Sequence, residues 1–321
     1  MRRRGFIYIQ SPSKRMLAKL FVTLFAAVFF AGCNQLVEPL QSLEATITKI
    51  GYLPSSSVGE FTAQPEIFTA SKFVFAEAFS GDYALFPTQV LKVAGVTTLS
   101  AVVTGALQNG MGVIPVVKTV SLNPKVEGYE QLMAKDADGN DLHVFDMWNP
   151  DFLEIVKGYL ADLKKLSVSA VAFTDEIVPP IETAFSEYSM AAFYKEYAKD
   201  IKAASAAEVD EWIKNSVKQF VIEVANSLQE VPVVFVVKAD DVAKYSWLYD
   251  VFDFVAVIVD SVDDVTTVAQ TVPVEKLMLL VDGSAVKDNA TLQLVLKAAA
   301  GVCKFIGIYG LNSSNVVALN F

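Results

Sequence analysis

Cysteine and histidine are scarce in this sequence, and arginine is absent after residue 15. The 321 residues include two cysteines and a single histidine, His143. A disulfide framework and a zinc site of cysteine and histidine ligands are therefore not supported, and a serine hydrolase triad is disfavoured. No Walker loop, nucleophile elbow or metalloprotease motif occurs. The sequence thus implies neither a metal nor a cofactor.

The charge balance limits the partners that the protein can bind. The formal net charge is −10, from 26 basic and 36 acidic residues. Six of the basic residues and none of the acidic ones lie in residues 1–32, so the rest of the chain carries a formal charge of −16. Binding to DNA or RNA depends on lysine and arginine side chains that neutralise phosphates. We therefore expect no nucleic-acid partner.

The N-terminal region has the features of a secretion signal. Basic residues precede an apolar stretch of 13 residues, 20–32, which is too short to span a bilayer but typical of a signal-peptide core. The junction FAGC, which ends at Cys33, resembles the cleavage and lipidation site of bacterial lipoproteins. We predict a signal peptide over 1–32 and a mature protein that is anchored outside the cytoplasm by a lipid on Cys33. An uncleaved N-terminal anchor is the alternative.

The remaining chain divides into a predicted tether, 33–70, and a predicted domain, 71–321. In the domain, short apolar runs alternate with stretches of helical periodicity, among them 82–95 and 241–252. Eight apolar runs read as strands: 72–79, 98–105, 112–119, 169–176, 232–239, 254–261, 276–283 and 304–311. Near-continuous apolar strands indicate a parallel sheet covered by helices, and eight of them favour a (β/α)8 TIM barrel. The alternative is a doubly wound open sheet.

Charged and polar residues follow most of these predicted strands. In a (β/α)8 barrel the active site lies at the C-terminal ends of the strands, so these residues are the candidate site. They are Glu77, Lys118, Asp175, Glu176, Lys238, Asp260, Asp282 and Tyr309. The alternative is that strand ends meet water and carry charge for that reason alone.

The stretch SAVAFTDE, residues 169–176, ends in two adjacent carboxylates. Side chains alternate along a strand, so small Ala172 and Thr174 share the interior face with Glu176, whereas Phe173 and Asp175 share the other face. By this parity Glu176 points into the mouth of the barrel. A carboxylic acid that is partly desolvated there would have a raised pKa and could act as a general acid.

The long third connection, 121–148, contains a predicted hairpin around Asp138-Gly139. The acidic residues there do not fit a calcium loop, because the glycine stands at the fourth position rather than the sixth. His143, Asp146 and Trp148 follow in this connection, and we expect them to bind substrate. The Trp148 ring could stack on a sugar or simply fill a hydrophobic gap.

These residues together resemble a known family. The segments LMAKDADGNDLHVFD, MWNPDF and AFTDE, within residues 128–197, resemble extracellular glycoside-hydrolase-like (β/α)8 barrels. They are similar to the glycosidase domain of poly-β-1,6-N-acetylglucosamine deacetylase lipoproteins. The resemblance implies a polysaccharide lying across the barrel mouth, with paired acids after the fourth strand. Asp175 and Glu176 occupy those positions, but Thr174 and Glu176 replace the histidine and second aspartate that are usual there.

A departure from a second pattern leaves two functions open. Chitinase-like barrels end the fourth strand with D-x-D-x-E, and the corresponding residues here are Ala172, Thr174 and Glu176. One reading is a glycoside hydrolase with Glu176 as general acid, Asp175 orienting it, and Asp260 or Asp282 as the opposing carboxylate. Substrate-binding residues would then be Glu77, Lys118, His143, Asp146, Trp148, Lys238 and Tyr309. The other reading is a non-catalytic carbohydrate-binding or scaffold lipoprotein. A solute-binding lipoprotein is disfavoured because the strands show no division into two lobes.

Overall fold

The computed structural model describes residues 47–286 and 288–320. The predicted signal peptide and Cys33 lie outside these residues. Among the helices that the structure describes, none is both long and apolar enough to cross a membrane.

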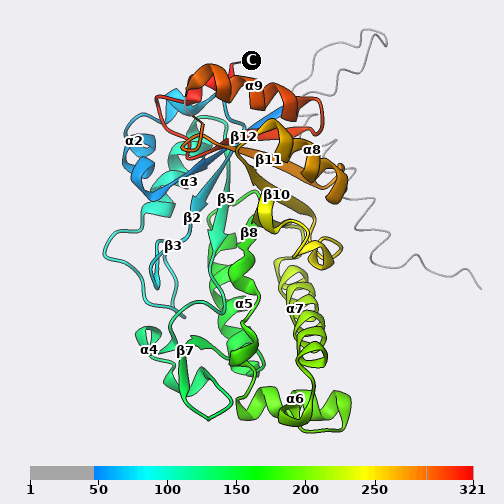
Figure 1. The fold of residues 1–321 in the computed structure, drawn as a ribbon. Helices are drawn as coiled ribbons and strands as arrows, with labels where there is room; N and C mark the ends of the chain where they lie inside the picture. Colours follow the sequence, from blue (N-terminus) through cyan, green and yellow to red (C-terminus); the bar gives the residue numbers. More distant parts are fainter. Residues whose placement is uncertain (1–46, 287, 321) are drawn as a thin grey trace, which may run out of the picture. The chain divides into compact units, whose positions relative to one another are not determined.

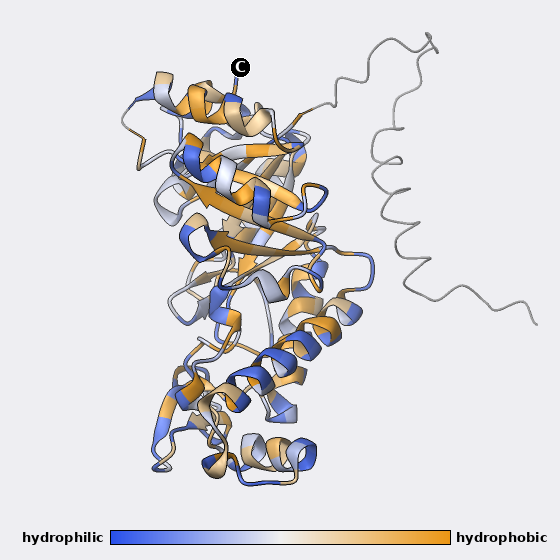
Figure 2. Ribbon diagram, turned by 45° about the vertical axis from the view of Figure 1, so that its right-hand side comes forward, coloured by the Kyte–Doolittle hydropathy of each residue, from blue (hydrophilic) through white to orange (hydrophobic). Residues whose placement is uncertain are grey.

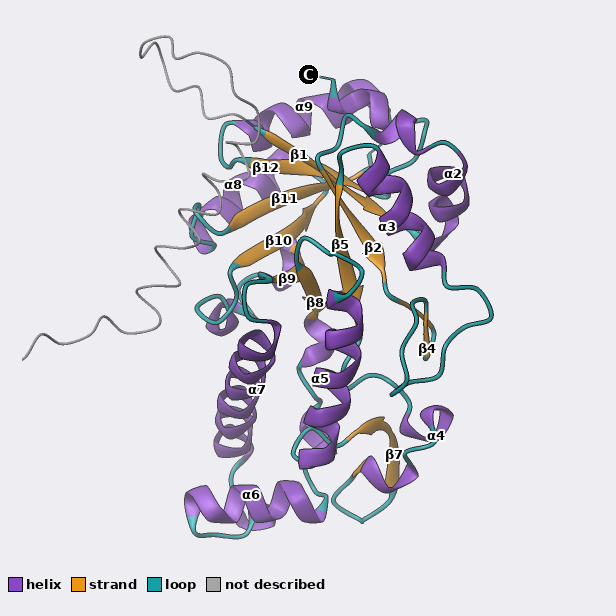
Figure 3. Ribbon diagram, turned by 180° about the vertical axis from the view of Figure 1, so that it is seen from behind, coloured by secondary structure: helices purple, strands orange, loops and turns teal. Residues whose placement is uncertain are grey.

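Eight parallel strands form a closed barrel, in which each strand pairs with the next one along the chain and the last pairs with the first (Figures 1 and 3). They are β1 (Thr48–Leu53), β2 (Phe73–Glu77), β5 (Gly112–Val117), β8 (Val171–Thr174), β9 (Val233–Lys238), β10 (Phe254–Val259), β11 (Leu277–Asp282) and β12 (Phe305–Tyr309). The predicted (β/α)8 barrel is therefore confirmed, and the open-sheet alternative is wrong.

Helices occupy six of the connections. The main ones are α2 (Val58–Ala63), α3 (Thr98–Gln108), α5 (Pro150–Lys164), α7 (Ala206–Leu228), α8 (Val262–Thr271) and α9 (Asn289–Ala300). After β9 the chain forms only two short 3₁₀ helices, η7 (Ala239–Asp241) and η8 (Ser246–Leu248), where a longer helix over 241–252 was expected. After β12 it ends with η9 (Val316–Leu319). The barrel is thus complete in its strands and irregular in its helical layer.

The expected strand over 72–79 is confirmed as β2, but three other expectations for the first part of the chain are wrong. The first barrel strand is β1, which lies inside the predicted tether, so the tether cannot extend to residue 70. The run 98–105 belongs to helix α3, because its buried residues follow the helical spacing i, i+3, i+4, i+7 rather than alternation. These residues are Leu99, Val102, Val103 and Ala106. The expected helix over 82–95 is also wrong, since its first part holds β4 (Tyr83–Ala84), which pairs with β3 (Phe79–Ser80).

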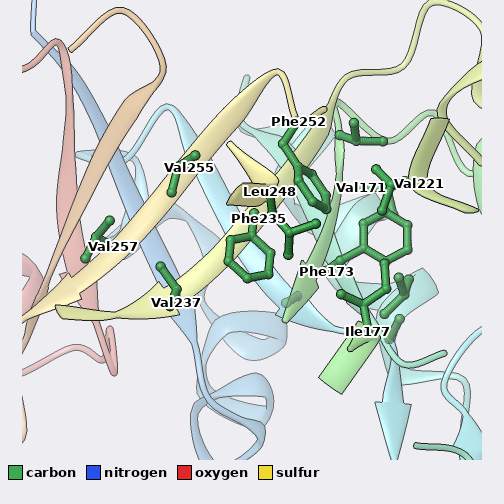
Figure 4. Packing of buried hydrophobic residues seen from close by; sticks show 14 of the residues in the cluster. Val171, Phe173, Ile177, Val221, Phe235, Val237, Leu248, Phe252, Val255 and Val257 are labelled. Atoms are coloured by element: carbon green, nitrogen blue, oxygen red, sulfur yellow. The ribbon is translucent and has the colours of Figure 1, made fainter. Parts of the chain in front are cut away.

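Two hydrophobic cores result from the alternation of side chains along the strands. The outer core lies between the barrel and its cover, and Figure 4 shows part of it. The labelled residues include Val171 and Phe173 of β8, Phe235 and Val237 of β9, Val255 and Val257 of β10, with Leu248 and Phe252 of the β9–β10 connection. In Figure 2 the strands are accordingly coloured as mostly apolar, whereas the helices mix polar and apolar residues.

The inner core fills the barrel interior. It includes Ile50, Phe75, Ile114, Ala170, Ala172, Val234, Ala256 and Leu280. At the N-terminal end of the strands, the rings of Phe254 and Phe305 meet edge to face at 5.5 Å. Phe73 also packs against this core, and a Cβ atom on Gly112 would lie 2.6 Å from its ring. Aromatic side chains thus occupy the interior at this end.

The connections after β5 and β8 extend well beyond the barrel (Figure 1). They carry α4 (Pro124–Glu127), the hairpin of β6 (Met133–Lys135) and β7 (Asp141–Phe145), and α6 (Glu187–Tyr197). Shorter 3₁₀ helices are η3 (Glu130–Leu132), η4 (Asp175–Ile177), η5 (Ile181–Thr183) and η6 (Ile201–Ala203); η1 (Ser55–Ser57) and η2 (Pro65–Phe68) follow β1. In Figure 1, β7 and α6 lie at the ends of α5 and α7 farthest from the barrel. We call this part, residues 123–149 and 181–205, the extension.

Candidate functional site at the barrel mouth

Polar side chains gather at the C-terminal ends of the strands, which we call the mouth. Glu77, Asp282 and Tyr309 end their strands at inward-facing positions, two residues beyond Phe75, Leu280 and Gly307. Lys118, Lys238 and Asp260 have the same parity. Residues in register on neighbouring parallel strands share a face of the sheet, and Tyr309 is in register with both Tyr52 and Asp282. The prediction that these strand-end residues share one end of the barrel is consistent with this register.

Two tyrosines form the floor of the mouth. The Tyr52 and Tyr309 rings lie 4.6 Å apart between centroids, and the other neighbour of Tyr52 is Phe75, at 6.1 Å and nearly parallel. Tyr52 is only 7% exposed. Burial raises the pKa of its phenol strongly, and the charges of Glu77 and Glu176 and the neighbouring Tyr309 add to the increase. Tyr52 therefore keeps its proton, and the charges of both glutamates act on it.

Glu77 ends β2 beside this floor. The hydroxyl of Ser55, in the connection after β1, donates a hydrogen bond to its Oε2 atom. Glu77 also acts on Tyr309, whose pKa is raised by burial and then by the charges of Asp282 and Glu77. Glu77 and Asp282 thus both lie within electrostatic range of the same tyrosine.

Glu176 reaches the mouth by a route that differs from the predicted one. The expected parity holds for Ala170, Ala172 and Phe173, but β8 ends at Thr174 and the chain turns into the 3₁₀ helix η4. The Thr174 side chain caps this turn by accepting a hydrogen bond from the Glu176 amide. Glu176 is exposed rather than desolvated, so that part of the expectation is wrong. Its Oε2 atom accepts a 2.7 Å hydrogen bond from the hydroxyl of Ser121.

Asp175 is exposed and lies at the rim. Its Oδ2 atom accepts a long hydrogen bond, 3.4 Å, from the hydroxyl of Tyr245. The ammonium of Lys244 lies 4.6 Å above the ring of the same tyrosine, and the pKa of Lys244 is raised by Tyr245 and then by nearby aspartates. The structure therefore gives Asp175 partners in the β9–β10 connection.

Asp282 and Asp260 both have local partners. The Oδ1 atom of Asp282 accepts hydrogen bonds from the amide and the hydroxyl of Ser284, at 2.8 and 2.6 Å, and from the amide of Ala285 at 3.3 Å. The amide of Asp260 donates to Asp264 at 3.2 Å. A hydrogen bond and the charge of Asp264 raise the pKa of Asp260, and burial, Asp240 and Asp282 add smaller increases.

Three predicted substrate-binding residues lie in the extension instead of the mouth. Trp148 stacks on Trp212 at 4.6 Å, with the rings within 10° of parallel, so it fills a gap between helices. Asp146 is buried and accepts a 2.6 Å hydrogen bond from Ser186 and another from the Trp148 amide; burial raises its pKa. His143 is exposed on β7. These residues lie on β7 or between β7 and the start of α5, which Figure 1 shows away from the barrel.

The two lysines differ in their surroundings. Lys118 is half-buried, and its carbonyl oxygen accepts a 2.7 Å hydrogen bond from the buried Tyr159. Lys238 is exposed at the end of β9. Beside the mouth, a hollow of about 310 Å³ lies over the ends of β11 and β12, with Asn289, Asn312 and Asn315 among its lining residues. Asn289 and Asn315 donate to backbone carbonyls of the same region.

Sequence reasoning missed Tyr52, Ser55 and Ser121. Tyr52 and Ser55 fell inside the expected tether, and Ser121 begins the third connection, ahead of the hairpin and the segments that carry the resemblance there. One signal was available for Tyr52, because IGYL at 50–53 is a short apolar run that ends before a proline and three serines. A serine whose hydroxyl donates a hydrogen bond to a carboxylate 55 positions away leaves no recognisable pattern in the sequence.

The chain matches no established protein-family profile, and no curated protein matches its sequence. Solved structures do share its fold. An α-L-fucosidase isoenzyme from Paenibacillus thiaminolyticus superimposes with a TM-score of 0.59 and 12% identity over 85% of this chain and 48% of its own. A β-galactosidase from Marinomonas ef1 gives 0.60 and 10% over 85% and 58%. The catalytic domain of a Paenibacillus polymyxa β-amylase gives 0.56 and 9% over 84% and 92%.

These similarities concern the fold, since every identity is at or below 12%. This chain spans about half the length of the fucosidase. The barrel is of the kind that these glycoside hydrolases use, and the chemistry of this chain has to be argued from its own mouth.

Proposed function

We propose that this protein is a glycoside hydrolase that acts on a polysaccharide at the barrel mouth. The observation that carries the proposal is the arrangement of the carboxylates Glu77, Glu176 and Asp282 around the rings of Tyr52 and Tyr309. Two carboxylates suffice for glycoside hydrolysis, one as general acid and the other as nucleophile or base. The half-exposed Tyr309 ring offers an apolar face for a sugar.

Glu176 is our choice for the general acid. It would donate a proton to the glycosidic oxygen as the bond to the anomeric carbon breaks, while a second carboxylate attacks that carbon or activates water. Asp282 and Asp260 were expected in the second role, and Glu77 joins them as a candidate. Asp175, held by Tyr245 at the rim, would orient Glu176 or the substrate.

The charge of the mouth indicates which sugars to test first. Its carboxylates have hydroxyl, amide or carboxyl partners rather than arginine, which is absent after residue 15. Such a surface repels anionic polymers and accepts neutral or amine-bearing ones. The proposed substrate class therefore includes partially deacetylated poly-β-1,6-N-acetylglucosamine, in keeping with the resemblance of residues 128–197.

A second candidate is a carbohydrate-binding protein without catalysis. The exposure of Glu176 and Asp175 favours it, because a general acid gains from partial desolvation. Here too the tyrosine floor would hold the sugar, and the carboxylates would contribute only hydrogen bonds.

The deciding experiment measures reducing ends released from a panel of polymers by the purified protein, together with binding by calorimetry. The panel holds partially deacetylated poly-β-1,6-N-acetylglucosamine, starch, and polymers with β-galactosyl or α-L-fucosyl linkages. Release that disappears in Glu176→Gln supports the hydrolase. Binding without release from any polymer would favour the binding protein instead.

We also propose that Cys33 carries the lipid that holds the protein at the outside of the cell membrane. The support is the FAGC junction after a short apolar run in residues 20–32. Metabolic labelling with an alkynyl fatty acid should mark the protein and fail in Cys33→Ser. Labelling that persists in this variant would contradict the anchor.

A further inference from the structure

The existing hydrogen bonds of the mouth carboxylates indicate which one works with Glu176. This inference rests on the proposed function and refines it. Asp282 accepts three hydrogen bonds on a single oxygen, from Ser284 and Ala285. A side chain that accepts from amides two and three positions ahead fixes the local backbone turn. Asp282 therefore has a structural task in the β11–α9 connection.

Asp260 is also engaged. Its backbone amide donates a 3.2 Å hydrogen bond to the carboxylate of Asp264. Asp264 is also the main cause of the raised pKa of Asp260. Asp260 is therefore engaged with α8 rather than directed only at the mouth.

Glu77 neither fixes a backbone turn, as Asp282 does, nor contacts a second carboxylate, as Asp260 does. Ser55 donates to its Oε2 atom, and among the described residues no other donor to Glu77 is present, so Oε1 is left for a substrate or a water molecule. Its position on β2 is inward-facing, next above Phe75. Glu176 is held in the same way, with Ser121 on Oε2. The two glutamates are thus matched: each is oriented by one serine hydroxyl from the connection after a neighbouring strand.

The barrel order places these glutamates on the same side of the mouth. β2 and β8 are the second and fourth strands, with only β5 between them. Neighbouring strands are about 4.8 Å apart, so the axes of β2 and β8 are roughly 10 Å apart. Side chains directed into the mouth converge from that spacing toward the separation of about 5–9.5 Å that two-carboxylate glycosidases use. The charges of both glutamates raise the pKa of Tyr52 on β1 further, beyond the larger effect of burial.

We propose that Glu77 is the carboxylate that acts opposite Glu176, and that the hydroxyl of Tyr52 positions the sugar between them. Glu176 gives its proton to the glycosidic oxygen as that bond breaks. Glu77 forms the new bond to the anomeric carbon, or removes a proton from the water that does so. Water supplies the hydroxyl group of the new reducing end and the proton that restores Glu176.

Tyr52 is suited to the positioning role. Its ring is fixed between Phe75 and Tyr309, and no described residue forms a hydrogen bond with its hydroxyl. A phenol that keeps its proton is a permanent donor toward a carboxylate or a sugar oxygen. Because its hydroxyl has no partner among the described residues, it can donate to an oxygen of a sugar held over the two rings.

The test compares carboxylate variants on the best polymer from the panel, and on a 2,4-dinitrophenyl glycoside of the same sugar. We expect Glu77→Gln and Glu176→Gln each to lower kcat on the polymer about 10²- to 10⁴-fold. Glu176→Gln should retain more activity on the dinitrophenyl glycoside, whose leaving group needs no proton, whereas Glu77→Gln should be impaired on both. Glu66→Gln, an exposed glutamate on η2, is the matched control and should behave as the unmodified protein.

Tyr52→Phe separates positioning from packing. We expect kcat to fall about tenfold with little change in KM and an unchanged thermal unfolding midpoint; a purely structural role would lower the midpoint and leave kcat and its pH profile as they were. Asp282→Asn that abolishes activity while Glu77→Gln keeps more than a tenth of it would overturn the role of Glu77 and leave the hydrolase proposal standing. No release of sugar from any polymer by the unmodified protein would overturn both.

Discussion

The hydroxyl of Ser121 donates a 2.7 Å hydrogen bond to the carboxylate of Glu176. The two residues follow neighbouring strands, β5 and β8, of the barrel. Because Glu176 stands on a short 3₁₀ turn rather than on the strand, this bond is the contact that fixes its carboxylate at the mouth.

Loss of this bond should reduce activity without unfolding the protein. A hydrogen bond to a charged group contributes about 1.5–3 kcal/mol, so Ser121→Ala should lower kcat by about 10- to 100-fold. Ser56→Ala, at an exposed serine on η1 that forms no hydrogen bond with Glu176 in the part of the chain that the structure describes, is the control and should have no effect. Steady-state kinetics on the same glycoside measures both, and equal rates for the two variants would contradict a positioning role for Ser121.

The stacked pair Trp148 and Trp212 should support the extension rather than sugar binding. Removing a large buried aromatic side chain costs about 3–5 kcal/mol, so Trp212→Ala should lower the free energy of unfolding by that amount. Trp148→Ala should lower it less, since Trp148 is only half-buried. Denaturant titration measures the two effects, and the double variant should show coupling of about 0.5–1.5 kcal/mol.

Sugar affinity distinguishes this account from the predicted stacking platform. The affinity of Trp148→Ala for sugar should equal that of the unmodified protein. A variant of normal stability that has lost its affinity would return Trp148 to the binding site.

Gly307 should tolerate no side chain. A Cβ atom there would lie 1.8 Å from the carbonyl oxygen of Ile50 on the paired strand, a backbone atom that cannot move aside. Gly307→Ala should therefore destabilise the barrel by more than the 1–3 kcal/mol usual for overpacking. Gly59→Ala is the matched control, because α2 leaves open space around Gly59 and alanine favours helix. Thermal unfolding should show a large loss for the first and a small gain for the second.

Glu127 should make stability depend on pH. It is 7% exposed, its Oε2 atom accepts from the Lys92 amide at 2.5 Å, and its buried Oε1 atom has no partner in the described residues. Burial raises its pKa by more than the hydrogen bond and the charge of Lys92 lower it, and the charge of Asp82 adds a smaller increase. The folded state therefore favours the protonated form, so stability falls as pH rises from the ordinary glutamate value through the raised one.

Glu127→Gln removes this titration. Relative to the unmodified protein, the free energy of unfolding of the variant should rise by about 1 kcal/mol as the pH is raised from 4 to 7. Urea unfolding at both pH values checks the difference, for which Glu130→Gln, an exposed neighbour, serves as control. If the free energy of unfolding of the variant exceeded that of the unmodified protein by the same amount at pH 4 as at pH 7, titration of Glu127 would be excluded as the cause.

Periodicity made most of the barrel predictable, and its failures have clear physical reasons. Runs such as PVVFVVKA are apolar on both faces, and only a covered strand needs that. TLSAVVTGALQ is equally apolar over its first half, but its buried residues lie on one helical stripe. IGYL was overlooked because Gly51 weakens the strand pattern, although any Cβ there would meet Leu311 at 2.3 Å.

The site was predictable where strand parity governs it. Glu77, Asp282 and Tyr309 could be assigned to the mouth because each ends a strand at an inward-facing position. Parity could not place Glu176 after the strand had ended, and it could not show that Trp148 meets Trp212, which lies 64 positions later. Contacts between distant connections depend on the assembled fold.

The aromatic rings of Phe73, Phe254 and Phe305 fill the barrel interior at the end opposite the mouth and so limit the path that a bound polymer could take. A polymer cannot pass through a barrel whose axis is filled with side chains. A polysaccharide bound as we propose would therefore lie across the strand ends, and its products would leave through the same opening by which it entered.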